Sequence, residues 1–403
     1  MTTKTIDPLS VKDPPGGEEG SEETEEEERS GGERSRETQV PFKVLKGHSD
    51  TVTAAQLCFN DSRVLSCSSD RSAILWNIES CRPLRVFDGL HSKNITECAV
   101  IPNSNRMVTV SWDKEMVVTD LETGQTVWRC RLVGLLTSCS SSSDGRLLVC
   151  AADPQNSIYI LDAAGGETLH HVGGHHRSTI TRCRFDLQSQ RVATVSADRR
   201  IKLWDLQSRK TTLSIDSNHN NVVSDCCFTN NGHFLCTASW DKSLKLWDLH
   251  AGGFRSHGGT SLQRSHESSV SSCSFSTDAD LLVSGSYDRT VALWDMSTLC
   301  QTLILKGHTD CVTDVSVSTD KKLVASASKD CTVRLWNIEN MEEIPEVVEK
   351  RAAEGAGNPI LKCEECGKPF PVCRLQTSDL LTQCFYCRLK EPSRHRPQPP
   401  PLT

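Results

Sequence analysis

The stretch that decides the fold is Ile201-Lys202-Leu203-Trp204-Asp205, and close copies stand at Leu244-Lys245-Leu246-Trp247-Asp248 and Val291-Ala292-Leu293-Trp294-Asp295. These copies belong to seven successive units, spaced by about 43 residues, in a chain of 403 residues. A repeat of this length is typical of arrays in which each unit buries its apolar face against the next one. Function is therefore expected on a surface that several units build together.

Each unit has the same parts in the same order. A histidine opens it, an alternating apolar and polar run follows, and a second run ends at an aspartate. A third run ends at Trp-Asp or Trp-Asn, and a fourth leads to the next histidine. This pattern predicts four short strands per unit and an all-β propeller. The opening histidines are His48, His91, His175, His219, His266 and His308, with intervals of 43, 84, 44, 47 and 42 residues, the longest of which spans a degenerate unit.

The motifs resemble the WD-repeat family from residue 40 to about residue 338. The resemblance implies a seven-bladed β-propeller. It also implies a hydrogen-bonded tetrad of histidine, turn aspartate, tryptophan, and a serine or threonine two or four residues before the aspartate. In the fourth unit that hydroxyl is expected from Thr194 or Ser196, and in the sixth from Ser284 or Ser286. The other matching members are His48, Asp70 and Trp76; His175, Asp198 and Trp204; His219, Asp241 and Trp247; His266, Asp288 and Trp294; and His308, Asp330 and Trp336.

The aspartate, histidine and hydroxyl of a tetrad superficially resemble a catalytic triad. A catalytic set is needed once, whereas this set recurs in register along the chain. A buried aspartate must be hydrogen-bonded, and the imidazole and the hydroxyl meet that need. The sequence has no Gly-x-Ser-x-Gly, phosphate-binding or His-Glu-x-x-His motif. We therefore expect structural tetrads and no enzymatic activity.

The last unit lacks a clear fourth strand, because Trp336-Asn337 leads into an acidic stretch. Residues 40–45 (VPFKVL) match the fourth-strand pattern and stand directly before a Gly-His pair. The sequence therefore predicts that strand 40–45 completes the last blade and closes the ring, which removes the open sheet edges that favour aggregation.

The regions outside the repeats differ in composition. Residues 1–39 hold five Lys/Arg and twelve Asp/Glu, a difference of −7 that equals the net charge of the whole chain. Such a segment buries too little apolar surface to offset its ordering, so we expect a disordered acidic tail, with docking to a basic partner as the functional alternative. The expected order is completed by the propeller at 40–338, a linker at 339–361, a four-cysteine zinc module at 362–390 and a proline-rich tail at 391–403.

Charge and hydropathy exclude several classes of protein. Residues 40–403 carry no net charge, which argues against nucleic acid as a partner. No apolar run resembles a signal peptide or a membrane span. We expect a cytoplasmic protein, with the nucleus as the alternative, that is neither secreted nor bound to a membrane. Most of the 20 cysteines are then expected as buried thiols and not as disulfides.

The second and third units depart from the pattern. The second has Thr119-Asp120 where Trp-Asp is expected, and the third ends in Leu161-Asp162. The third also has Val133-Gly134 in place of an opening Gly-His pair, so its tetrad cannot form. Two interpretations stay open: relaxed constraint on these blades, or a rim adapted to a partner.

A partner surface is predicted around one mouth of the central channel. In WD-repeat propellers the histidine loops and the aspartate turns share a face, so the residues beside the turn aspartates surround this mouth. A rim of aromatic and basic residues has the composition of an interaction hot spot and suits a peptide with acidic or aromatic anchors. The alternative is that these residues only cap the turns. They are Trp112, Trp240 and Tyr287 before the aspartates, and Arg71, Lys114, Arg199, Lys242 and Arg289 after them.

Two Cys-x-x-Cys pairs lie near the end of the chain. Cys363 and Cys366 form the first, and Cys384 and Cys387 the second. In a reducing compartment this spacing predicts one structural zinc ion with four thiolate ligands, whose binding supplies the folding energy of a segment too short for its own core. The alternatives are a redox-active pair and a decayed site, and Cys373 is a spare or alternate ligand.

These features predict a non-enzymatic scaffold for protein interactions. One face of a monomeric propeller within a complex would bind a protein or peptide partner, and no small-molecule substrate is expected. The alternative is a substrate adaptor in a ubiquitin-ligase or RNA-processing complex, with the zinc module as the reader. The Trp-Asp-x-Arg motif of ubiquitin-ligase adaptors is absent from the clearest units, where Asp205, Asp248 and Asp295 are followed by other residues.

Overall fold

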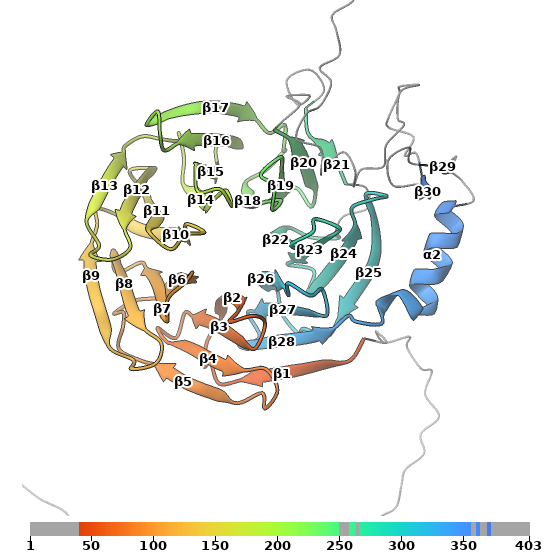
Figure 1. The fold of residues 1–403 in the computed structure, drawn as a ribbon, viewed down its shortest axis with the longest axis horizontal. Coiled ribbons are helices and arrows are strands. Elements are labelled where there is room, and N and C mark those ends of the chain that lie inside the picture. The colour runs from red at the N-terminus through yellow and green to blue at the C-terminus, as the bar shows by residue number, and fades with distance from the viewer. Residues whose placement is uncertain (1–39, 250–257, 263–265, 356–359, 363–368, 372–403) are drawn as a thin grey trace, which may run out of the picture. The chain divides into compact units, whose positions relative to one another are not determined.

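The computed structural model describes residues 40–249, 258–262, 266–355, 360–362 and 369–371. Seven four-stranded antiparallel sheets are arranged as blades around a central axis (Figure 1). This arrangement confirms the prediction of an all-β, seven-bladed propeller. Three predicted parts lie outside the described residues, namely the acidic tail 1–39, the ligands Cys363, Cys366, Cys384 and Cys387 with Cys373, and the proline-rich tail 391–403.

The blades follow one another in chain order, and each is given from the innermost strand outward. Blade 1 holds β2 (Val52–Cys58), β3 (Arg63–Ser68), β4 (Ala73–Asn77) and β5 (Pro83–Phe87); blade 2 holds β6 (Ile95–Ile101), β7 (Arg106–Ser111), β8 (Glu115–Asp120) and β9 (Thr126–Arg131); blade 3 holds β10 (Leu135–Ser141), β11 (Leu147–Asp153), β12 (Ser157–Asp162) and β13 (Thr168–Val172). Blade 4 holds β14 (Ile180–Phe185), β15 (Arg191–Ser196), β16 (Arg200–Asp205) and β17 (Lys210–Asp216); blade 5 holds β18 (Val223–Phe228), β19 (Phe234–Ser239), β20 (Leu244–Asp248) and β21 (Thr260–Ser261). Blade 6 holds β22 (Val270–Phe275), β23 (Leu281–Ser286), β24 (Thr290–Asp295) and β25 (Cys300–Lys306); blade 7 holds β26 (Val312–Val317), β27 (Leu323–Ser328), β28 (Thr332–Asn337) and β1 (Phe42–Lys46).

The ring is closed by the two ends of the repeat array. Strand β1 pairs antiparallel with β28, with Phe42 opposite Trp336 and Lys46 opposite Thr332 (Figure 1). The rings of Phe42 and Trp336 lie 4.7 Å apart, and Leu45 is buried in the same blade. The N-terminal strand therefore supplies the outer strand that the last repeat lacks.

The hydrophobic core lies between neighbouring blades. One cluster, for example, joins Val195 and Ile201 of blade 4 to Val223 and Cys226 of blade 5. The alternation of each strand sends one set of apolar side chains into such a layer, which explains why a single blade is not stable alone. Cysteine serves here as a small apolar residue, and burial raises the pKa of the Cys183 thiol to about 12.

Part of the segment 339–361 is helical rather than the linker we expected. A 3₁₀ helix η1 (Met341–Glu343) leads into helix α2 (Pro345–Gly355), which lies beside β25 (Figure 1). Val347 is fully buried in the core cluster of blades 6 and 7, and Lys350 Nζ donates to the Thr302 carbonyl at 3.4 Å. The burial of Val347 and the hydrogen bond of Lys350 hold the segment against the propeller. Further on, β29 (Ile360–Lys362) pairs with β30 (Pro369–Pro371).

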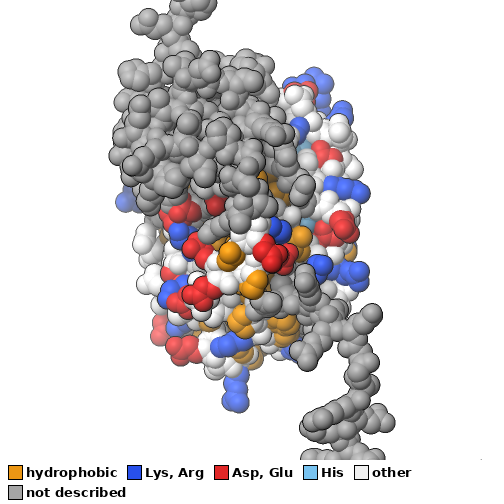
Figure 2. Space-filling view, turned by 90° about the vertical axis from the view of Figure 1, so that its right-hand side faces the viewer, with side chains coloured by type: hydrophobic (Ala, Val, Ile, Leu, Met, Phe, Trp, Pro, Cys, Tyr) orange, Lys and Arg blue, Asp and Glu red, His pale blue; other side chains and the backbone are white. Residues whose placement is uncertain are grey.

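The side of the molecule that carries α2 shows no field of one charge sign. Acidic and basic side chains are interspersed over its visible part (Figure 2). Among the described residues, no helix has the length and apolar character needed to cross a membrane.

Removing residues 40–46 tests the closure of the ring. This deletion takes away β1 and uncovers the edge of β28, so we expect the melting temperature to fall by at least about 5 °C and the transition to broaden. Deletion of residues 2–38, which leaves β1 intact, serves as the control. Calorimetric transitions of equal sharpness and midpoint for both deletions would contradict the closure.

Candidate functional site

In four blades the tetrad is a chain of hydrogen bonds that runs from a tryptophan to an aspartate. In blade 7, Trp336 Nε1 donates to Ser326 Oγ at 2.9 Å, and Ser326 Oγ lies 2.7 Å from His308 Nε2. His308 Nδ1 lies 2.8 Å from Asp330 Oδ2. An indole only donates and a carboxylate only accepts, so the protons point in one direction through a neutral imidazole. Blades 1, 5 and 6 repeat this arrangement with His48, Ser66, Asp70 and Trp76; His219, Thr237, Asp241 and Trp247; and His266, Ser284, Asp288 and Trp294.

Burial and hydrogen bonding act together on the pKa values of this set. Burial lowers the pKa of His308, which favours the neutral ring that the hydrogen bonds require. Burial would raise the pKa of Asp330, but the hydrogen bonds from His308 and Thr332 outweigh it, and the net pKa is lowered. The aspartate is thus a fixed anion whose acceptor sites are used by the turn, which leaves the tetrad suited to structure and not to proton transfer.

The two candidate hydroxyl positions have different roles. The residue four before the aspartate contacts the histidine, as Thr237 does in blade 5. The residue two before it fixes the turn, because Ser239 Oγ accepts the backbone N–H of Asp241 at 3.1 Å and donates to the Val222 carbonyl at 2.9 Å. In blades 4 and 6 the tetrad hydroxyls are therefore Thr194 and Ser284, while the serines two residues later hold the turns.

In blade 4 the tetrad histidine is His176, and the assignment to His175 was wrong. His176 Nδ1 lies 3.0 Å from Asp198 Oδ2, and its Nε2 lies 2.8 Å from Thr194 Oγ1. The spacing of histidine and aspartate is 22 residues here and in the other tetrads. This constant spacing was the signal in the sequence, whereas the Gly-His pair selects the preceding histidine. His175 is also buried, with Nε2 at 3.0 Å from Thr194 Oγ1.

The two divergent blades differ from each other. Blade 2 keeps His91 Nδ1 at 3.0 Å from Asp113 Oδ2, and His91 Nε2 at 2.9 Å from Thr109 Oγ1. Thr119 stands in place of the tryptophan, and its buried hydroxyl has no hydrogen-bond partner. This partial set lies outside the tetrads assigned from the sequence, although His91 and Asp113 have the same spacing of 22 residues. Blade 3 has Leu161 buried at the tryptophan position.

The predicted rim residues lie on the tetrad face of the propeller, at the tips of the turns. Trp112 and Trp240 are 46% and 40% exposed, and Tyr287 is partly buried with Lys329 Nζ 4.9 Å from its ring centroid. Lys329 was not among the predicted rim residues; it precedes the blade 7 aspartate and supplies a cation where Cys331 follows that aspartate. The five predicted cations are exposed and share one turn position in five blades, with positive φ at Arg71, Lys114, Arg199, Lys242 and Arg289.

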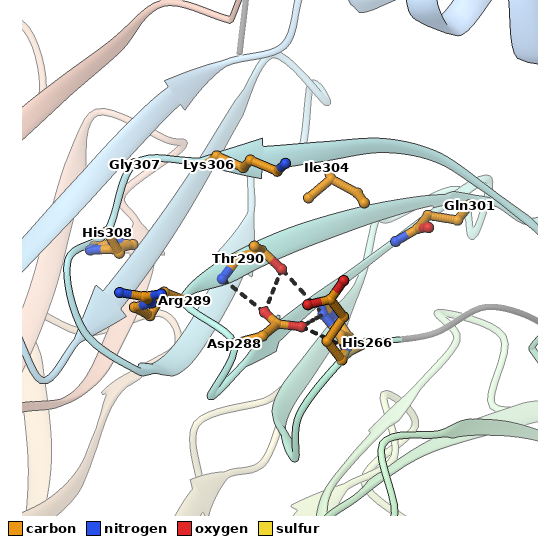
Figure 3. A pocket seen from close by; sticks show the side chains of 10 residues that line it. His266, Asp288, Arg289, Thr290, Gln301, Ile304, Lys306, Gly307 and His308 are labelled. Atoms are coloured by element: carbon orange, nitrogen blue, oxygen red, sulfur yellow. Dashed lines mark hydrogen bonds and ion pairs between the residues drawn. The ribbon is translucent and has the colours of Figure 1, made fainter. Parts of the chain in front are cut away.

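A cleft of about 630 Å³ opens beside blade 6 on this face. Figure 3 shows two members of the blade 6 tetrad, with Asp288 held by His266 and by Thr290, and with Arg289 directed toward His308 of blade 7. Acidic and basic groups both line the cleft, since Glu267 joins Arg289. The cleft therefore extends the rim outward between two blades without a strong charge of one sign.

Two comparisons with known proteins place the chain. A model of the WD domain, G-beta repeat, matches residues 39–77, 166–205, 209–248, 259–295 and 298–337. WD repeat-containing protein 88 of Homo sapiens is 47% identical over 388 residues, which cover 96% of this chain and 82% of that protein. The chain belongs to the WD-repeat family. The unmatched interval from 78 to 165 coincides with most of the two divergent WD repeats, blades 2 and 3.

Relatives of lower identity match a smaller part of the chain. The U5 small nuclear ribonucleoprotein 40 kDa protein of Dictyostelium discoideum is 27% identical over 185 residues, 45% of this chain and 51% of that protein. Pre-mRNA-processing factor 17 of Mus musculus is 27% identical over 166 residues, 40% of this chain and 28% of that protein.

In the described part of the chain, no group of three or more His, Cys, Asp or Glu is placed to hold a metal ion.

A pair of Thr→Val substitutions separates tetrad hydroxyls from other buried hydroxyls. Thr237→Val keeps the shape but leaves His219 and Trp247 without their shared partner, so we expect it to cost about 1–3 kcal/mol in the free energy of unfolding. Thr119→Val removes a hydroxyl that has no partner, so it should be neutral or stabilising. Urea unfolding measures both. Equal losses for the two variants would contradict the structural role of the tetrad.

The pH dependence of stability tests the neutral histidines. Burial lowers the pKa of His48, His91 and His308 and lowers the pKa of His175 to about 3. As the pH falls below about 6.5, the unfolded chain binds protons before the folded chain does, and stability is lost. We expect a lower urea midpoint at about pH 5 than at about pH 7.5.

The matched control for this pH dependence uses two histidines that are close in sequence. His175→Gln should flatten the pH dependence, whereas His171→Gln, at an exposed position, should leave it unchanged. A midpoint that does not change between the two pH values would show that these rings are not held neutral.

Proposed function

We propose that this chain is a non-enzymatic scaffold whose tetrad face binds a peptide segment of a protein partner. The exposure of Trp112 and Trp240 on one face carries this proposal. Large aromatic side chains are enriched at the centres of interfaces, where their burial contributes much of the binding free energy. The tetrad side chains beneath them are already engaged in hydrogen bonds, so the rim and not the tetrad is available to a partner.

The character of the rim narrows the kind of partner. Cations lie directly after the turn aspartates of five blades, so acidic and basic groups are neighbours at the mouth, and residues 40–403 have no net charge. A partner would therefore be selected by apolar and aromatic anchors with individual ion pairs at the edges, and less by overall charge. The interspersed charges argue against a nucleic-acid partner.

The names of two relatives favour one setting over others. One relative is named for a small nuclear ribonucleoprotein and another for pre-mRNA processing. On that basis we propose an intracellular, nuclear assembly that processes RNA as the setting of the scaffold, in preference to a ubiquitin-ligase adaptor. The sequence also predicted, as an alternative, an adaptor in an RNA-processing complex whose cysteine tail recognises the substrate. This alternative is compatible with the proposed setting.

A triple substitution of Trp112, Trp240 and Tyr287 by alanine tests the tetrad face. Because these side chains project from turns and not from the core, we expect an unchanged melting temperature and loss of a stable partner in quantitative co-purification from cells. Leu84→Ala with Leu169→Ala is the matched control, since these residues are 50% and 44% exposed on the outer strands β5 and β13. Partners that survive the triple variant but are lost in the control would place the site on the outer edge.

We also propose that Cys363, Cys366, Cys384 and Cys387 bind one structural zinc ion, as the spacing predicts. Elemental analysis of the purified full chain is expected to give one zinc per molecule. Cys363→Ser with Cys366→Ser should abolish it, and Cys81→Ser, far from these pairs in the sequence, should not. Retention of zinc in the double variant would overturn the assignment. Loss of partners only in this variant would identify the tail as the reader.

A further inference from the structure

A second cavity opens at the end of the central channel opposite the tetrads. The innermost strands run from the tetrad face to the turn into the second strand, so their C-terminal halves reach the opposite face. These halves and turns line a cavity of about 430 Å³ to which all seven blades contribute. We call it the channel cavity. The proposed peptide site on the tetrad face makes no use of it.

The wall of the channel cavity includes a buried ionic network that joins four blades. Arg182 of β14 contacts Glu97 of β6 at 2.9 Å, Asp225 of β18 at 2.8 Å and Asp314 of β26 at 2.8 Å. Arg184 also contacts Glu97, at 2.6 Å. Glu97, Arg184, Asp225 and Asp314 line the cavity, so the network is accessible from this mouth.

The charges of this network do not balance. Three carboxylates share two guanidinium groups, which leaves one negative charge in excess at a buried position. An uncompensated charge is costly where water is scarce. Burial raises the pKa of Asp314, which agrees with a site that lacks one positive charge.

The hydrogen bonds of Ser272 are independent evidence of the same charge imbalance in the network. Its Oγ lies 2.8 Å from Asp225 Oδ2 and 2.7 Å from Asp314 Oδ1. A hydroxyl has one proton and can donate to only one of them. The other contact is a hydrogen bond only if that carboxyl carries a proton of its own. The contacts therefore fit a network that holds one extra proton, on Asp225 or Asp314.

Aromatic residues line the same cavity as these carboxylates. Phe185, Phe228 and Phe275 are the last residues of β14, β18 and β22, so they occupy one register position in three successive blades. Phe228 and Phe275 are partly exposed. Ring faces attract cations, and their apolar area suits the aliphatic stem of a lysine or arginine.

We propose that the channel cavity binds a cationic side chain, an arginine or lysine in a loop or terminus of a protein partner, against Phe228 and Phe275 and beside Asp314. The cation takes the place of the proton that the network otherwise holds. The partner would thus contact the propeller on the face opposite the tetrads. The two faces are separate sites, because Arg182 spans the channel between them.

The test uses the full chain and two tripeptide probes, acetyl-Gly-Arg-Gly-amide and the same peptide with neutral citrulline. Ligand-observed NMR titration is expected to show saturable binding of the arginine probe and none of the citrulline probe. Asp314→Asn removes the excess charge and should weaken arginine binding by about tenfold or more. Phe228→Leu keeps apolar volume without the aromatic face and should weaken it by about threefold. Trp240→Ala on the tetrad face should have no effect.

The melting temperature distinguishes a role of Asp314 in binding from a role in holding the fold together. Asp314→Asn balances the network, so the variant should melt no lower than the wild-type chain. If it unfolds, Phe228→Leu still decides the question. Equal affinity of the arginine probe for wild-type chain and both variants would overturn the proposal, as would equal binding of the citrulline probe or no saturable binding to the wild-type chain. Since Trp240→Ala addresses the tetrad face alone, failure here leaves the proposed peptide site untouched.

Discussion

The hydroxyl group at the centre of each tetrad is the constraint on which the face of the propeller depends. Ser326 accepts from an indole and donates to an imidazole, and this imidazole in turn holds the aspartate of the turn. Each bond contributes only about 1 kcal/mol, but loss of one partner leaves the others buried and unpaired. The set therefore works as a unit that fixes where each turn lies. The exposed rim residues take their positions from it, because they are neighbours of the fixed aspartates.

Two further interactions turn seven such blades into one body. At the periphery, β1 pairs with β28 and joins the two ends of the repeat array. At the centre, Arg182 joins blade 4 to carboxylates of blades 2, 5 and 7. The first interaction closes the ring, and the second crosses the channel and divides it into two mouths. One sequence repeat thereby yields two chemically different faces: an aromatic and mixed-charge rim, and a cavity with an excess carboxylate.

Much of the fold was predictable because the repeat fixes it locally. Period-2 alternation and the recurring Trp-Asp pair determined the strands, and the missing fourth strand of the last unit indicated where the N-terminal strand would pair. The error at His175 arose from reading a dipeptide and not the constant spacing to the aspartate. Helix α2 was missed because its burial depends on β25, which is distant in sequence. The Arg182 network could not be foreseen either, since residues from four blades meet only after the ring closes.

Locating the partner on the propeller would test directly whether the rim is the binding surface. Crosslinking mass spectrometry with a lysine-reactive reagent, applied to complexes isolated from cells, reports which lysines lie near a bound protein. We predict that crosslinks to a partner concentrate on the exposed rim lysines Lys114, Lys242 and Lys329. Crosslinks confined to Lys43 and Lys210, which are exposed on the outermost strands β1 and β17, would contradict it and place the partner on the edge of the blades.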